Sequence, residues 1–174
     1  MSSDADKLVK AASAGDDAKV KRLLKAKVDV NYGISRKGVP GITALADACA
    51  YGHVHVARLL LKAKAAVDLR CGNHYEALYV ACQEGRLECA QLLIEANATV
   101  DLEAKDANTP LYKAAERGHA PIVQLLLEAK AKVDPLQSEG ATPLIVSAAR
   151  GHAVVVKLLL DAKASTTVRW ESGK

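Results

Sequence analysis

The sequence predicts an all-α fold in which five repeats, each a pair of helices, stack into a solenoid. Glycine returns every 33 residues at Gly52, Gly85, Gly118 and Gly151. About seven residues after each glycine, a run of three large aliphatic residues predicts a second helix. Nine residues before each glycine, a Thr or Glu precedes the expected first helix. These three markers share one period, which indicates a repeat array.

A fifth copy precedes these four, with Gly15 in the place of Gly52 and a longer interval of 37 residues. The four extra residues enlarge the turn at 32–42, which contains Arg36 and Lys37. Insertions of this kind map to loops on one face, often the binding face. We expect a single domain over residues 1–174, with repeats at about 4–36, 41–73, 74–106, 107–139 and 140–170.

The fourth repeat shows how one unit is built. Thr109 is placed to cap the first helix, and Pro110 at its first position loses no needed donor. Gly118 can take the positive φ that often ends a helix. A second helix begins near Pro121, with the apolar spacing of an amphipathic helix from Ile122 onward. One unit cannot bury this apolar face alone, so neighbouring units are expected to stack.

The motif resembles the ankyrin repeat family over roughly residues 4–168. Thr-Pro-Leu begins at Thr109 and Thr142, as in that family. Two positions depart from its pattern. The His that follows Thr-Pro-Leu in the family is replaced by Ala46, Tyr79, Tyr112 and Ile145. The Gly that follows the family's second helix is replaced by Lys27, Lys64, Asn97, Lys130 and Lys163. The resemblance implies a helix-turn-helix solenoid with β-turn loops that binds protein partners through turn tips and a concave helix face.

Catalytic and metal-binding chemistry finds no support in the sequence. Recurrence in phase makes His53, His119 and His152 structural parts of the repeat. His53 and His55 are two residues apart, so on a helix they point in different directions and form a poor metal site. Three of the four cysteines occupy inward positions and are interpreted as core residues: Cys49, Cys82 and Cys89. We therefore expect no enzymatic activity, no cofactor and no metal.

The charge distribution points to the first repeat. Residues 1–41 contain nine Lys or Arg and five Asp, whereas residues 42–174 contain fifteen of each sign. Such a basic region favours an acidic partner, and without interleaved aromatic residues it is weak evidence for nucleic acid. No apolar run reaches ~18 residues, so no membrane span is expected. The N-terminus lacks a signal pattern, and we expect a cytoplasmic protein, with the nucleus as the alternative.

The candidate binding residues lie where the repeats differ most, at the turn tips and at the ends of the first helices. They are Arg36, Lys37, Tyr51, Arg70, Asn73, Tyr75, Tyr79, Gln83, Glu84, Lys105, Asp106, Asn108, Tyr112, Lys113, Glu116, Arg117, Ser138, Glu139 and Arg150. Tyr and Arg are enriched at binding hot spots, which favours Tyr51, Tyr75, Tyr79 and Tyr112 as anchors. For Tyr79 and Tyr112 the alternative is local packing in the place of the family's His.

Function is predicted to be non-catalytic protein binding by a monomer. One alternative is weak self-association through the last repeat, because that repeat has no obvious polar cap before Trp170. Two further alternatives stay open: a designed or excised scaffold without an evolved partner, and the targeting or regulatory segment of a larger enzyme. The identity of the partner is not readable from the sequence.

Overall fold

The structure is a computed structural model that describes residues 3–36, 39–70, 76–104, 107–136 and 140–167. It consists of two compact units, residues 1–98 and residues 99–174. Three helix pairs belong to the first unit: α1 (Asp4–Ser13), α2 (Asp17–Lys25), α3 (Ala44–Ala50), α4 (Val54–Lys62), α5 (Ala77–Gln83) and α6 (Leu87–Glu95). Two pairs belong to the second: α7 (Pro110–Arg117), α8 (Ala120–Glu128), α9 (Pro143–Ala149) and α10 (Ala153–Asp161). This confirms the predicted fold class of stacked helix pairs.

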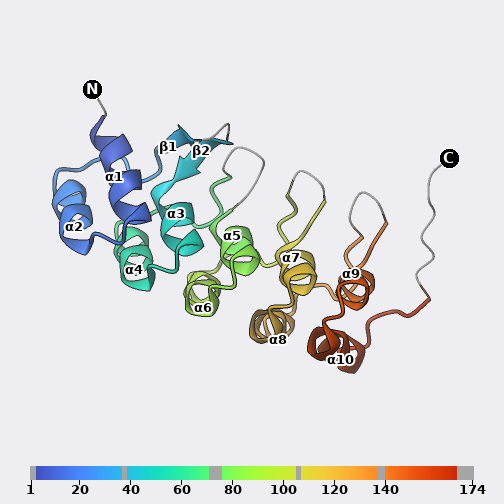
Figure 1. Ribbon diagram of the computed structural model, residues 1–174. Helices are drawn as coiled ribbons and strands as arrows, with labels where there is room; N and C mark the ends of the chain where they lie inside the picture. Colours follow the sequence, from blue (N-terminus) through green and yellow to red (C-terminus); the bar gives the residue numbers. More distant parts are fainter. Residues whose placement is uncertain (1–2, 37–38, 71–75, 105–106, 137–139, 168–174) are drawn as a thin grey trace. The chain divides into compact units, whose positions relative to one another are not determined.

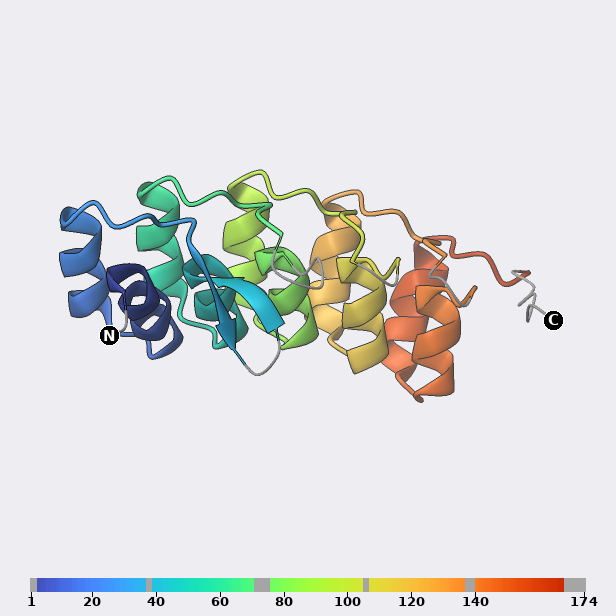
Figure 2. The same cartoon turned by 90° about the horizontal axis from the view of Figure 1, so that it is seen from above.

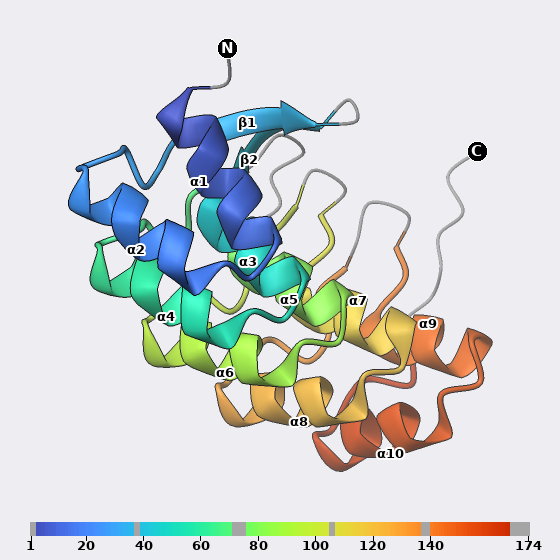
Figure 3. The same cartoon turned by 60° about the vertical axis from the view of Figure 1, so that its left-hand side comes forward.

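The helices of each unit form two layers. In the first unit, the first helices α1, α3 and α5 lie side by side, and the second helices α2, α4 and α6 lie beside them (Figures 1 and 3). In the second unit, α7 packs on α9 and α8 on α10 in the same manner. None of the helices in the described part of the chain combines the length and hydropathy needed to cross a membrane.

Threonine side chains begin three of the first helices. Oγ1 of Thr43, Thr109 and Thr142 accepts a hydrogen bond from the backbone N–H three residues later, at 3.1, 3.2 and 3.3 Å. Each bond satisfies a first-turn donor that has no partner inside the helix. Capping by Thr109 is thus confirmed, and so is the helix end at Gly118, where φ is +75°.

The residues that replace the family's Gly all adopt the left-handed conformation. Their φ values lie between +58° and +66°, at Lys27, Lys64, Asn97, Lys130 and Lys163. Backbone bonds close each of these turns, for example from Ala65 N to Leu60 O at 3.0 Å. The backbone path of the family is therefore kept without its glycine.

The core consists of small and aliphatic side chains. Leu60, Leu93, Leu126 and Leu159 of the second helices are fully buried. Alanines at the helix crossings are buried as well, at Ala48, Ala81, Ala114 and Ala115. Ala148 holds the same place in the last repeat but is exposed. Val154 and Leu160 of α10 are also exposed, by 65% and 44%, so the last pair presents an apolar outer surface.

The enlarged turn contains a hairpin, where the sequence predicted a loop. Strands β1 (Gly33–Arg36) and β2 (Val39–Thr43) pair antiparallel beside α1 (Figure 2). The pairing has an irregularity between Ile34 and Arg36. A Cβ on Gly33 would lie 2.6 Å from the Gly41 backbone, so glycine is needed for this close approach. Ile34 points into the core at 8% exposure, which anchors the hairpin.

Candidate functional site

The residues that follow Gly52, Gly85 and Gly151 connect their repeats to the preceding ones. Nε2 of His53 donates to the Ser13 carbonyl at 3.1 Å, and Nε2 of His152 to the Glu116 carbonyl at 3.0 Å. Arg86 replaces the histidine and donates from Nε to the Ala50 carbonyl at 3.0 Å. These carbonyls are at the ends of first helices, where no intrahelical donor remains. The structural assignment of His53 and His152 is confirmed.

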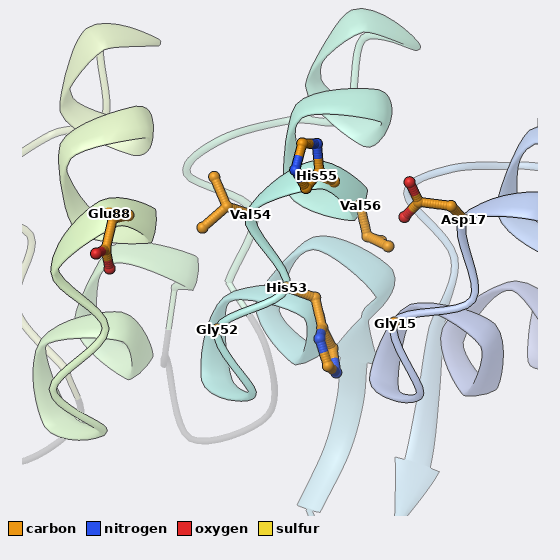
Figure 4. A pocket seen from close by; sticks show the side chains of 8 residues that line it. All are labelled: Gly15, Asp17, Gly52, His53, Val54, His55, Val56 and Glu88. Carbon is orange, nitrogen blue, oxygen red and sulfur yellow. The ribbon is translucent and has the colours of Figure 1, made fainter.

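His53 and His55 point apart in Figure 4, as their helical spacing predicts. They line a pocket of about 580 Å³ together with Asp17, Val54 and Glu88. The described residues contain no group of three His, Cys, Asp or Glu side chains that could hold a metal ion. The pocket lies at the starts of the second helices α2, α4 and α6.

Two predicted residues of the first unit meet at a second hollow. Tyr51, the C-cap of α3, is 51% exposed, and its ring stacks on His53 at a centroid distance of 6.3 Å. The hollow measures about 260 Å³ and is lined by Tyr51, Glu84, Asp47, Ala50 and Arg86. We call these five residues the Tyr51 surface.

Gln83 extends this surface, because its amide donates to Glu84 Oε1 at 2.9 Å. Arg86 is the exposed residue of the Tyr51 surface that sequence reasoning missed as a binding candidate. Its place after the recurring Gly85 indicates a structural part of the repeat. A signal was present, since a cation stands there in place of the recurring His.

In the second unit, three predicted residues form an ion-pair cluster. Lys113 Nζ lies 2.6 Å from Oε2 of Glu116, and Arg150 Nη2 lies 3.1 Å from its Oε1. Burial works against the charge of Glu116, but the bond from Lys113 and the nearby cations lower its pKa. The cluster joins α7 to the end of α9, and Arg117 stands exposed at the end of α7. We call Lys113, Glu116 and Arg150 the Glu116 cluster.

Two predicted anchors are not on the surface. Tyr79 is 1% exposed and Tyr112 is 8% exposed. Such burial leaves little ring surface for a partner, so it favours their local packing over the binding role.

Arg70 lies beside a residue that the sequence did not single out. Glu76 replaces the capping threonine at the start of α5 and is 2% exposed. Arg70 Nε is 3.2 Å from Glu76 Oε1 without the geometry of a hydrogen bond, and neither carboxylate oxygen has a hydrogen-bond partner among the described residues. Burial raises the pKa of Glu76 to about 7, and the nearby charge of Arg70 opposes this rise only in part. The absence of threonine at this capping position was the feature of the sequence that could have singled out Glu76.

The cysteine assignment is confirmed for three residues. Cys49, Cys82 and Cys89 are fully buried. Contact with the Cys89 thiol, together with burial, raises the pKa of Cys49, and burial raises that of Cys82. The Cys49 and Cys82 thiols are thus protonated core groups, whereas the hydrogen bond with the Cys49 thiol lowers the pKa of Cys89.

The structure describes only some of the remaining candidate residues. Asn108 is half-buried before α7, and its carbonyl accepts from Ala104 N at 2.9 Å. Arg36 is described in its backbone alone. Outside the described residues lie Lys37, Asn73, Tyr75, Lys105, Asp106, Ser138 and Glu139.

Comparison with known families supports the fold. A family model described as ankyrin repeats in three copies matches residues 8–106 and again residues 96–169. Together the two matches cover most of the chain. A search of curated proteins gave no match.

Proposed function

Because the chain belongs to the ankyrin repeat family, whose repeats generally serve as protein–protein interaction modules, we propose that it binds a protein partner without catalysis. The binding surface consists of first-helix ends and turn tips. The observation that carries this proposal is the half-exposed Tyr51 beside a hollow lined by Glu84 and Arg86. An aromatic ring at the edge of a charged hollow is typical of a binding hot spot.

The Tyr51 surface contributes binding energy through its aromatic ring and orients the partner through its charges. The Tyr51 ring is held by its stack on His53, so little side-chain freedom is lost when a partner covers it. Glu84 and Arg86 both line the hollow and carry opposite charges, which suits a partner segment with a polar group. Asp47 closes the hollow from inside, since it is 4% exposed.

The Glu116 cluster provides a second contact region in the second unit. Lys113 is only partly exposed, whereas Arg150 stands at the surface. Because Glu116 already fixes both cations, Arg150 is held in place for a partner carboxylate. We place the chain in the cytoplasm or the nucleus, as a monomer before it binds.

Partner capture tests this proposal with matched variants. Purified chain is used to capture proteins from the source cell, in parallel with the Tyr32→Ala variant and with the double variant Tyr51→Ala, Glu84→Ala. Tyr32 is a suitable control because it is also exposed, by 41%, but precedes the hairpin. A partner should be retained by Tyr32→Ala and lost by Tyr51→Ala with Glu84→Ala. Equal retention by all variants would show that binding occurs elsewhere, and capture of no protein would favour the scaffold alternative.

A further inference from the structure

Cations occupy equivalent positions on the second helices of the first two repeats. Lys21, Lys25 and Lys27 in and after α2 correspond to Arg58, Lys62 and Lys64 in and after α4. All six residues are exposed. We call them the cation ladder.

The ladder has two rows that lie side by side, because α2 packs directly against α4 (Figure 3). Four residues along a helix advance about 6 Å, and packed helices are about 10 Å apart. Within the described residues, no ion pair involves any of the six cations. Their charges are therefore available to a ligand.

Acidic residues limit the ladder. In the third repeat, the equivalents of Arg58, Lys62 and Lys64 are Gln91, Glu95 and Asn97. Glu95 is exposed and accepts from Gln91 at 3.2 Å, and Glu88 is exposed at the start of the same helix. Asp16 and Asp17 begin α2. The positive area is consequently confined to two repeats.

We propose that the cation ladder binds a short acidic polypeptide segment, on the second-helix layer and apart from the Tyr51 surface. An extended chain advances about 3.3 Å per residue, so side chains two apart are about 6.6 Å from each other. That spacing matches the cations along one row.

The extent and composition of the ladder favour this occupant over larger anions. A nucleic acid or a lipid surface would extend beyond two repeats and meet Glu88 and Glu95. The exposed large apolar residues of the described chain are Tyr32, Tyr51, Leu136, Val154 and Leu160, none of them on α2 or α4. The ladder thus offers no ring for base stacking and no apolar side chain for insertion into lipid.

Fluorescence anisotropy with the full chain tests the proposal. The probe is a labelled octapeptide in which four glutamates alternate with serines, and its control has glutamine for glutamate. Binding should require the glutamates and weaken as salt rises, since exposed charges are screened. The triple variant Lys21→Gln, Lys25→Gln, Lys62→Gln should bind about tenfold more weakly, because each exposed pair contributes modestly.

A matched variant removes the same charge elsewhere. Lys130→Gln, Lys157→Gln, Lys163→Gln changes exposed lysines of the second unit and should leave binding unchanged. Arginine at the three ladder positions should restore binding, and thermal melts should coincide for all variants. Equal weakening in both triple variants would overturn the proposal. Tighter binding of a 20-nucleotide oligo(dT), or of vesicles with phosphatidylserine, would also overturn it. The Tyr51 variants are not used here, so the two proposals can fail independently.

Discussion

Nε2 of His152 donates a hydrogen bond to the backbone carbonyl of Glu116 at 3.0 Å, so the end of α7 is capped by the following repeat. The same glutamate holds Lys113 and Arg150 through its side chain. A structural bond and the Glu116 cluster therefore depend on one residue. Substitutions near it should affect stability and surface geometry together.

The His152 bond should contribute measurably to stability. His152→Ala leaves the Glu116 carbonyl without this donor, and we expect unfolding free energy to fall by about 1 kcal/mol. Urea denaturation measures the change. His55→Ala is the control, because His55 is exposed at the start of α4 and should alter stability little. Equal losses in the two variants would contradict a specific role for the bond.

Gly118 is constrained by its neighbour as well as by its backbone. Its φ is +75°, and an added Cβ would lie 2.6 Å from Nδ1 of His152. Gly151 has a φ of +76°, but no described atom beyond its chain neighbours lies within 4 Å of such a Cβ. Gly151→Ala should cost about 1 kcal/mol from the left-handed backbone alone. Gly118→Ala should cost distinctly more.

A double variant isolates the steric part of that cost. Gly118→Ala combined with His152→Ala removes the ring that the Cβ would meet, so the two losses should not add. Thermal or urea unfolding of the four proteins in the cycle measures the coupling. If Gly118→Ala and Gly151→Ala proved equally destabilising, the close approach to His152 would have no energetic role.

Glu76 should make the stability of the protein depend on pH. Its pKa rises from an ordinary 4.5 to about 7 in the folded state, because burial penalises the carboxylate. The protonated form is favoured by folding, so this stabilisation is fully present below pH 4.5 and is lost as pH rises through 7. We expect the free energy of unfolding to fall by about 2 kcal/mol between pH 5 and pH 8. Denaturant titrations at both pH values measure it.

Glu76→Thr should remove that pH dependence. Threonine is the capping residue at Thr43, Thr109 and Thr142, where its hydroxyl bonds a first-turn N–H. The variant should therefore be more stable than the parent at pH 8, by about 1 kcal/mol from the restored cap and more from the removed charge. Glu84→Thr serves as a control for an exposed glutamate. Identical pH profiles for parent and Glu76→Thr would refute the assignment.

Lys64→Gly should change stability by less than about 1 kcal/mol. Glycine relieves the φ of +64°, but it increases the entropy of the unfolded chain and removes a cation near the last helical carbonyls. Lys64→Ala keeps the strained φ and loses the cation, so it should be less stable than Lys64→Gly. A gain well above 1 kcal/mol in the glycine variant would show that these effects do not balance.

Much of the fold could be predicted from the sequence because the same capping, turn and apolar residues recur in successive repeats. The caps at Thr109 and Thr142 and the helix end at Gly118 all follow from preferences within a few residues. The hairpin at the enlarged turn could not be foreseen in this way. Its pairing depends on the close approach of Gly33 to Gly41 and on Ile34 reaching the core.

The candidate site was only partly predictable. Tyr51 and Glu84 lie at one hollow, and Lys113, Glu116 and Arg150 form one cluster, as divergence between repeats had suggested for each residue singly. Which of them touch depends on side chains from successive repeats. Arg86 and Glu76 were missed because both stand at positions of the repeat that the motif assigns to structure.

The sequence by itself determined the period of the array, the positions of its helices and the turns that need a positive φ. These are local properties, set by helix spacing and by the conformations that each residue allows. Only the tertiary structure decided that Tyr79 and Tyr112 are buried while Tyr51 is exposed. Burial depends on what packs over a side chain, and Tyr51 at the end of α3 is covered less than Tyr79 and Tyr112 in the first turns of α5 and α7.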